Sequence, residues 1–389
     1  MPNPLKTIYK RTRLFGGLAY HQITKTRAPV IAYLLVTNRC QMSCTYCFVD
    51  HVALPGEMST ERIITLVDEL YEKGTRMICL MGGEPLLKPG IEKIVDHIVS
   101  KGIICDMTTN ALLIKHKLAV VKKLDSIMIS LDGDEEANDL NRGKGTWLKI
   151  VDGILIAREN GITVRLNCVL TRKNMHSLEY MLQFAKDNGL FVTFALMAEP
   201  YQTPENLKEF TMSDEEIKET YTKLKKLRDE GWPVLFSDHT LDYVINYPLA
   251  YNEIIFKNAS QKALDYYRKE CRYGRTMAYI ESDGKTYPCA ALWNVDFFKP
   301  KSLQDKEGLQ GAWDNMENLP CHTCFQPGCS EWNYLTTPEG VWHGISFTVS
   351  QFFSRNKRQS GETIQRIRKI SPIQTSQAKK EELIQVRVS

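Results

Sequence analysis

Short apolar runs alternate with longer amphipathic stretches over the first half of the chain. The apolar runs predict six buried strands, at Ile31–Val36, Met77–Met81, Ile103–Met107, Ser126–Leu131, Ile162–Leu170 and Phe191–Leu196. Between them apolar residues recur at helical spacing, as over Ser59–Lys73, which is followed by the helix-stopping Gly74. This α/β pattern over residues 30–200 predicts a parallel sheet with right-handed crossovers, a partial (β/α)6 barrel of TIM type. We therefore expect functional residues just after the strands.

Three cysteines follow the first strand in the spacing C-x3-C-x2-C. They are Cys40, Cys44 and Cys47, with Tyr46 just before the last. Thiolate is the ligand that iron–sulfur clusters require. A cubane has four irons, so three cysteines leave one iron open to a substrate or cofactor. A zinc loop is the alternative, but zinc sites usually pair cysteines in two knuckles, and no second knuckle follows nearby.

Polar or glycine-rich segments follow the next strands. Gly82-Gly83-Glu84-Pro85 comes after the second strand, where two glycines would let the backbone approach a ligand and Glu84 could accept a hydrogen bond from an ammonium group. The third and fourth strands end in Thr108-Thr109-Asn110 and Ser130-Leu131-Asp132-Gly133. Simple turns are the alternative for each of these segments.

Two further polar residues lie near the predicted strand ends. Arg142 falls in a polar loop after the fourth strand, where it could pair with a carboxylate, although a plain surface arginine is an equal alternative. Asn167 lies inside the fifth strand and would face either a bound cofactor or a helix.

A second cysteine group lies towards the C-terminus. Cys271 and Cys289 flank two β-prone runs joined by Ser282-Asp283-Gly284, which predicts a hairpin that brings its two ends together. The pair Cys321 and Cys324, and then Cys329, follow. This group predicts a second cluster or a zinc site. The remaining cysteines lie in predicted strands and are expected to pack as small core residues: Cys79, Cys105 and Cys168.

The first cysteine loop resembles the signature of the radical SAM superfamily. In that family the amine and carboxylate of S-adenosylmethionine (SAM) chelate the open iron, and one electron cleaves the sulfonium to give a hydrogen-abstracting 5′-deoxyadenosyl radical. The resemblance implies that the methionyl amine binds at the Gly82–Pro85 segment. It also implies that the ribose or methionyl carboxylate is held by residues among Tyr46, Thr108, Asn110, Ser130, Asp132, Arg142 and Asn167. Ala111 stands where the family usually has glycine.

The second cysteine group resembles the auxiliary-cluster extension called SPASM, or its shorter twitch form. Cys271-x12-Gly284-x4-Cys289 fits that pattern, whereas the second half has fewer cysteines than full SPASM. The resemblance implies one auxiliary [4Fe-4S] cluster, most simply on Cys271, Cys289, Cys321 and Cys324, with Cys329 as a spare or alternative ligand. Such a cluster could take an electron from a substrate radical, which would make the net reaction an oxidation or a crosslink.

Composition and charge narrow the class of protein. The chain is 43% hydrophobic and 25% charged, and no apolar run is long enough to predict a membrane-spanning helix. Neither a signal peptide nor a disulfide framework is indicated, which favours the cytoplasm. Basic residues concentrate at both ends. The apolar, basic head could lie on a membrane surface or pack under the barrel, whereas a tail without aromatic residues does not favour nucleic acid.

Five segments are expected along the chain. They are a basic head (1–29), a radical SAM core barrel (30–200), a bridging segment (201–270), an auxiliary cluster module of α+β type (271–335) and a basic, partly disordered extension (336–389). The expected function is hydrogen abstraction from a peptide, or from a lipid or small molecule, with electrons from a donor such as flavodoxin or ferredoxin. The competing hypothesis is a non-catalytic iron–sulfur or zinc protein that transfers electrons or scaffolds a partner.

Overall fold

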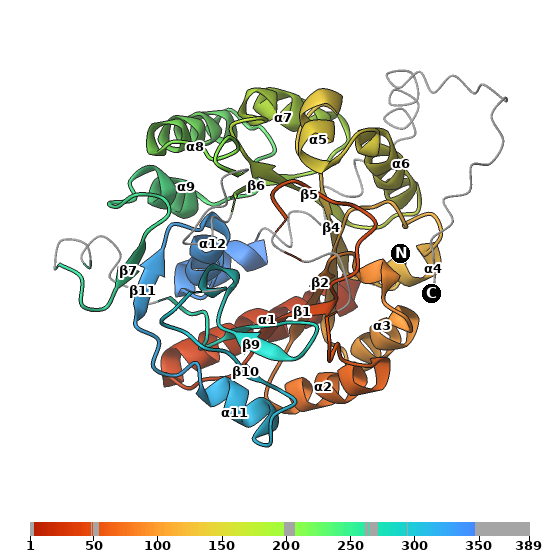
Figure 1. Cartoon of the computed structure of the whole chain (residues 1–389), viewed down its shortest axis with the longest axis vertical. Helices are drawn as coiled ribbons and strands as arrows, with labels where there is room; N and C mark the ends of the chain where they lie inside the picture. Colours follow the sequence, from red (N-terminus) through yellow and green to blue (C-terminus); the bar gives the residue numbers. More distant parts are fainter. Residues whose placement is uncertain are drawn as a thin grey trace.

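A curved, nine-stranded sheet forms the framework of the computed structural model, which describes residues 4–47, 49, 54–197, 207–260, 264, 271–293 and 295–346. The strand order is β10-β9-β8-β1-β2-β3-β4-β5-β6. Strands from β8 through β1 to β6 are parallel, whereas the β8–β9 and β9–β10 pairs are antiparallel. Because β10 and β6 are edges, the barrel is open between them (Figure 1).

The strands coincide closely with the apolar runs of the sequence. The barrel strands are β1 (Ile31–Thr37), β2 (Met77–Gly82), β3 (Ile104–Thr109), β4 (Ser126–Ser130), β5 (Val164–Leu170) and β6 (Val192–Leu196). The later strands are β7 (Ile254–Phe256), β8 (Met277–Ile280), β9 (Lys285–Tyr287), β10 (Lys301–Ser302) and β11 (Cys321–Cys324). The partial parallel barrel predicted from the alternating pattern is therefore confirmed.

Helices cover the outer face of the sheet (Figure 1). They are α2 (Thr60–Glu72), α3 (Ile91–Ser100), α4 (Leu118–Val121), α5 (Glu135–Arg142), α6 (Thr146–Glu159) and α7 (Leu178–Asp187), with the short 3-10 turns η1 (Pro85–Leu87) and η2 (Met175–Ser177). Ser59 caps α2 by accepting a hydrogen bond from the Arg62 backbone, and Gly74 follows its end at φ +101°. Arg142 is the last residue of α5, so the prediction that it lies in a loop is wrong.

The head of the chain forms the long helix α1 (Pro4–Thr24), which lies across the base of the barrel (Figure 1). Leu14, Phe15 and Leu18 are buried in the core. Lys10 donates a hydrogen bond to the Ile103 carbonyl oxygen (3.0 Å) and pairs with Asp125 (2.7 Å), two residues that immediately precede β3 and β4. The helix is therefore a structural part of the barrel, at the end opposite the first cysteine loop. No helix among the described residues is long and apolar enough to cross a membrane.

The C-terminal half completes the side of the barrel between β6 and β10 (Figure 1). It contains α8 (Asp214–Asp229), α9 (Asp238–Ile245), η4 (Ala290–Leu292), α11 (Gly308–Asp314) and α12 (Pro327–Leu335). Val234, between α8 and α9, makes an isolated bridge with Val192 of β6. The predicted hairpin is present as β8 and β9, yet β8 pairs in parallel with β1, from Ile31–Met277 to Leu34–Ile280. The hairpin therefore extends the barrel sheet.

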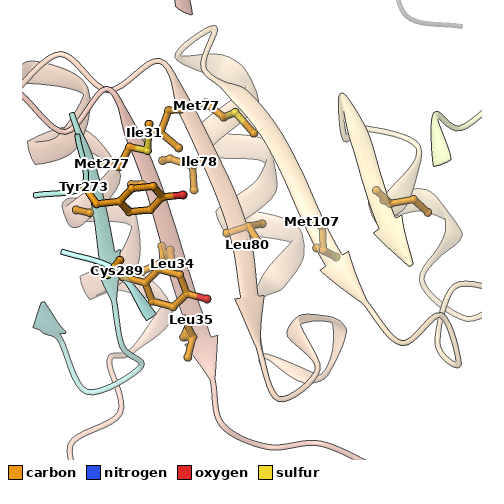
Figure 2. Close-up of a cluster of buried hydrophobic side chains, with 14 of the residues drawn as sticks. Ile31, Leu34, Leu35, Met77, Ile78, Leu80, Met107, Tyr273, Met277 and Cys289 are labelled. Atoms are coloured by element: carbon orange, nitrogen blue, oxygen red, sulfur yellow. The ribbon is translucent and has the colours of Figure 1, made fainter. Parts of the chain in front are cut away.

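Buried side chains on β8, β1, β2 and β3 form one cluster, shown in Figure 2. Its members include Ile31, Leu34, Leu35, Met77, Ile78, Leu80, Met107 and Met277. Removing this apolar surface from water is the main force that holds neighbouring strands together. The cluster thus fixes the relative positions of the strand ends that carry the site.

Candidate active site

The first cysteine loop leaves the end of β1, and its base packs against the Gly82-Gly83 backbone. Gly83 donates a hydrogen bond to the Thr37 carbonyl oxygen and Glu84 to that of Arg39, both at 2.8 Å. A Cβ atom added to Gly82 would lie 2.1 Å from the Thr37 oxygen, and one on Gly83 would lie 2.4 Å from the Arg39 oxygen. The close approach predicted for these glycines is therefore an approach to the chain's own backbone. It fixes where the loop begins.

Glu84 is fully buried and joins three segments. Its carboxylate accepts hydrogen bonds from the Thr109 hydroxyl (2.9 Å), the Asn110 backbone (2.9 Å) and the Leu86 backbone (3.1 Å). Burial raises the pKa of Glu84 to about 7, although these hydrogen bonds favour the ionised form. The Glu84 side chain thus braces η1 against the end of β3, and its predicted contact with an ammonium group stays a prediction.

Asn110 extends this network to the first cysteine. Its amide nitrogen lies 3.6 Å from Cys40 Sγ, and the Met42 backbone nitrogen lies 3.4 Å from the same sulfur. The side-chain oxygen of Asn110 accepts a hydrogen bond from Gln41 (3.1 Å). Ala111, the next residue, has φ +69°, a conformation that glycine adopts more readily and that accounts for the usual glycine at this position.

The second part of the loop is held by Asp132, Arg142 and Tyr46. Asp132 accepts a short hydrogen bond from the Tyr46 hydroxyl and another from the Val169 backbone (3.0 Å). Arg142 Nε lies 2.8 Å from Asp132, and its guanidinium lies over the Tyr46 ring, 5.6 Å from the centroid. Asp132 and Arg142 are both buried, and burial raises the pKa of Tyr46. In this structure the charges of Asp132 and Arg142 neutralise each other. The contacts with SAM that the sequence predicts for Tyr46, Asp132 and Arg142 stay predictions.

The other predicted cofactor contacts lie on the inner face of the barrel. Thr108, Ser130 and Asn167 are half-buried on β3, β4 and β5, and Ser130 is the register partner of Asn167. The Asn167 side-chain oxygen accepts a hydrogen bond from Thr193 at 2.9 Å. Asn167 therefore lies on the inner face of the sheet, and its predicted contact with the cofactor stays a prediction. Pro85 begins η1 and is buried.

The five C-terminal cysteines gather at one place. A pocket is lined by Cys271, Cys289, Cys321 and Cys324. Cys329 interacts with Cys289 and Cys324, so it lies within the group and not apart from it. Hydrogen bonding from Cys329 lowers the pKa of Cys324. Asn333 on α12 donates a hydrogen bond to Cys271 Sγ at 3.4 Å.

Both cysteine groups have the donor chemistry of an iron–sulfur cluster. All eight cysteines are free thiols, and those of the first loop are half-buried. Burial raises the pKa of Cys40 to about 12 and that of Cys44 to about 11, so a bound cation is needed to keep them as thiolates at neutral pH. In the described part of the chain, no three His, Cys, Asp or Glu side chains converge to hold a single metal ion. A cubane instead binds each thiolate through a different iron, so its ligands surround it.

Sequence reasoning missed a set of side chains that cross the barrel interior. The Tyr33 ring stacks with those of Tyr279 and Tyr273, at centroid distances of 5.3 and 6.5 Å. Tyr273 lies in the cluster of Figure 2, which also contains Cys289. Arg165 on β5 pairs with Asp106 on β3 at 3.2 Å. The charged Arg165 in a mostly apolar run is a signal in the sequence, whereas the tyrosines resemble ordinary strand residues.

The barrel part of the chain is similar to known proteins in sequence. The family model of the Radical SAM superfamily matches residues 34–185. The AdoMet-dependent heme synthase of Nitratidesulfovibrio vulgaris is 25% identical over 267 residues, 66% of this chain and 72% of that protein. The PqqA peptide cyclase of Bradyrhizobium diazoefficiens is 24% identical over 330 residues, 76% of this chain and 78% of that protein.

A solved structure shares the fold at low sequence identity. SuiB of Streptococcus suis bound to S-adenosylmethionine superposes with a TM-score of 0.60 at 18% identity, covering 76% of this chain and 68% of SuiB. SuiB has also been solved with its precursor peptide SuiA, with a TM-score of 0.59 at 17% identity, 77% of this chain and 67% of SuiB covered. The open parallel barrel, the three-cysteine loop braced at the end of β1 and the family match agree, and we conclude that residues 34–185 of this chain form a radical SAM domain.

Proposed function

We propose that Cys40, Cys44 and Cys47 hold a [4Fe-4S] cluster and that SAM binds to it across the strand ends. When bound, this pair supplies hydrogen-atom abstraction through one-electron cleavage of SAM. The chain's own groups would set the position of the cluster. The Asn110 amide and the Met42 backbone N–H point at Cys40 Sγ and would stabilise its thiolate.

The predicted SAM contacts divide into two groups by exposure. Glu84, Asp132 and Arg142 are buried and hydrogen-bonded within the protein, so we assign them to holding the loop and the strand ends. The half-buried Thr108, Ser130 and Asn167 keep polar atoms on the inner face of the sheet, and we assign them to contacts with SAM. The Gly82–Pro85 backbone would lie beside the methionyl amine.

We further propose that the C-terminal cysteines hold one auxiliary [4Fe-4S] cluster. The observation that carries this proposal is that Cys271, Cys289, Cys321 and Cys324, which come from three segments of the chain, line one pocket, and that Cys329 interacts with two of them. The Tyr273 ring, which stacks on Tyr33, lines the same pocket as these cysteines, and Cys329 interacts electrostatically with Tyr33, Tyr273 and Tyr279. This arrangement supports an electron acceptor close to the substrate.

The reaction that fits these two sites is a net oxidation or a crosslink. The substrate would lose a hydrogen atom to the SAM-derived radical and one electron to the auxiliary group, and a proton would leave to solvent. A low-potential donor such as flavodoxin or ferredoxin would reduce the first cluster. We favour a peptide substrate because a relative covering 76% of the chain is named a peptide cyclase. A second candidate is a membrane lipid, favoured by the exposed apolar side chains of Leu5, Tyr9 and Ile23 on α1.

Iron content tests the proposal directly. Anaerobically reconstituted wild type should bind about eight irons per chain, whereas Cys40→Ala/Cys44→Ala/Cys47→Ala and Cys271→Ala/Cys289→Ala should each bind about four. The matched control is Cys105→Ala, because Cys105 is a buried core residue of β3 that belongs to neither cysteine group. A wild type with about four irons would contradict the auxiliary cluster. A C-terminal variant that retains about eight would contradict its ligand set.

A further inference from the structure

Arg165 lies on the inner face of β5 and reaches across the barrel. Val164, Leu166 and Cys168 are buried towards the helices, whereas Arg165 and Asn167 alternate with them and are half-buried. Arg165 pairs with Asp106 on β3, although β4 lies between these two strands. Side chains two strands apart can meet in this way only on the concave side of a curved sheet.

The register of the sheet confirms this placement. Tyr279, Tyr33, Cys79 and Asp106 are successive partners across β8, β1, β2 and β3, so they share one face. Arg165 interacts electrostatically with Tyr33 and Cys79, which belong to strands on the far side of the barrel. The guanidinium therefore lies among the inward-facing side chains, below the strand ends that carry the cysteine loop.

Positive charge is in excess around this position. Lys10 and Asp125 neutralise each other in their ion pair. Asp106 remains with two cations, because Arg11 from α1 and Arg165 both interact with it. Among these described residues, the three cations at the base of the barrel are Lys10, Arg11 and Arg165, and the two carboxylates are Asp106 and Asp125. The group therefore carries a net positive charge, and Arg165 brings it to the barrel interior.

Most hydrogen-bonding capacity of Arg165 is unused by the described residues. A guanidinium has five N–H donors, and Arg165 makes one hydrogen bond, a 3.2 Å contact to Asp106. Its side chain keeps 28% of its surface exposed, whereas Asp106 keeps 2%. The Asn167 amide nitrogen, two residues along the same face, has no partner among the described residues either. A planar guanidinium with free N–H donors can bind a carboxylate or a phosphate through two parallel hydrogen bonds.

We propose that Arg165 binds an anionic group, a carboxylate or a phosphate, of the substrate inside the barrel, and that Asp106 orients it. This inference rests on the proposed radical SAM reaction at the strand ends above it. It narrows the substrate to molecules that can insert a carboxylate or phosphate between the first cysteine loop and the base of the barrel. An acidic peptide side chain or terminus meets this condition, and so does a phosphorylated small molecule.

Labelling of arginines with phenylglyoxal tests the proposal on the reconstituted enzyme. Peptides that contain Arg165 and Arg172 are quantified by mass spectrometry with SAM, inorganic phosphate or succinate added separately. Arg172 is the matched control because it pairs with Glu216 on the outside of the protein. We expect phosphate or succinate to slow labelling of Arg165 about tenfold without affecting Arg172. Which anion protects better identifies the ligand as phosphate or carboxylate.

Three results would overturn the proposal. They are no labelling of Arg165, labelling that neither anion slows, and protection by SAM alone, which would make Arg165 a cofactor ligand. The Arg165→Gln variant should lose anion binding. Arg172→Gln, which removes an arginine on the outside of the protein, should keep both anion binding and the wild-type rate of 5′-deoxyadenosine formation from SAM without substrate. Arg165→Lys keeps the positive charge but lacks the planar, paired N–H donors of a guanidinium. It should bind the anions about tenfold more weakly than wild type. Absence of 5′-deoxyadenosine in wild type would instead refute the proposed function and leave the anion result standing.

Discussion

Tyr46 of the cysteine loop donates its hydroxyl hydrogen to Asp132, two residues after the end of β4, and so ties the loop to this strand end. Arg142 lies over the Tyr46 ring and pairs with the same carboxylate. The position of Cys47, one residue after Tyr46, therefore depends on groups that come from β4 and α5.

Removing the Tyr46 hydroxyl should loosen this attachment. Tyr46→Phe leaves Asp132 its ion pair with Arg142, so we expect a loss of about 1 kcal/mol in unfolding free energy. Asp132→Ala leaves Arg142 buried without a counter-ion and should cost about 3–5 kcal/mol. Urea unfolding of the apoprotein measures both effects. Tyr20→Phe is the control, because Tyr20 is exposed on α1; equal losses in Tyr46→Phe and Tyr20→Phe would contradict the prediction.

The approach of Gly83 to the base of the loop gives a steric prediction. A methyl group at position 83 would meet the Asn38 and Arg39 carbonyl oxygens at 2.4 Å, so Gly83→Ala must displace the start of the loop. We expect a destabilisation of about 1–3 kcal/mol and loss of roughly half of the bound iron. Gly16→Ala is the matched control, since nothing lies within 4 Å of its added Cβ and it sits in α1. It should be neutral or stabilise the helix. Full iron content in Gly83→Ala would show that the loop tolerates the shift.

Glu281 gives the stability of the protein a dependence on pH. Burial and nearby Asp283 raise the pKa of Glu281 to about 7. The folded state then keeps this proton between the unfolded pKa, about 4.5, and pH 7, whereas the unfolded state releases it. Stability from this group is fully present below the unfolded pKa and is lost as the pH rises towards 7, at no more than about 1.4 kcal/mol per pH unit. Glu281→Gln should flatten the profile of unfolding free energy in this range. An unchanged slope would argue against a raised pKa.

The buried face of α1 makes the head essential to folding. Leu14, Phe15 and Leu18 belong to the core, so Leu14→Glu should destabilise the protein strongly and give aggregation on expression. Leu5→Glu with Ile23→Glu changes only exposed positions and should leave unfolding free energy within about 0.5 kcal/mol of wild type.

The Leu5→Glu/Ile23→Glu double variant also tests membrane binding by vesicle flotation, because it removes exposed apolar side chains of α1 without disturbing the core. If wild type floats with anionic vesicles and the double variant does not, the lipid alternative gains support. A wild type that stays in the soluble fraction would contradict it.

Local patterns predicted the parallel barrel and placed polar residues near the first loop, but they did not predict the contacts that these residues make with one another. Apolar periodicity locates each strand, and parallel strands place Gly83, Asn110 and Asp132 at one edge. The pairing of β8 with β1 could not be predicted, because it joins residues more than two hundred positions apart. The sequence of β8 resembles that of β1, and nothing in it indicates which strand it pairs with. Arg142 was assigned to a loop because α5 is short and largely polar. The inward position of Arg165 depends on the curvature of the sheet, which periodicity alone does not specify.

The chemistry attributed to the first cysteine loop can be measured in one experiment. The protein is reconstituted anaerobically with iron and sulfide, incubated with SAM and dithionite, and assayed for 5′-deoxyadenosine by liquid chromatography. We predict formation of 5′-deoxyadenosine by the wild type and by Cys105→Ala, and none above background by the variant lacking Cys40, Cys44 and Cys47. A fully reconstituted wild type that leaves SAM intact, or a triple variant as active as wild type, would contradict a radical SAM site at the end of β1.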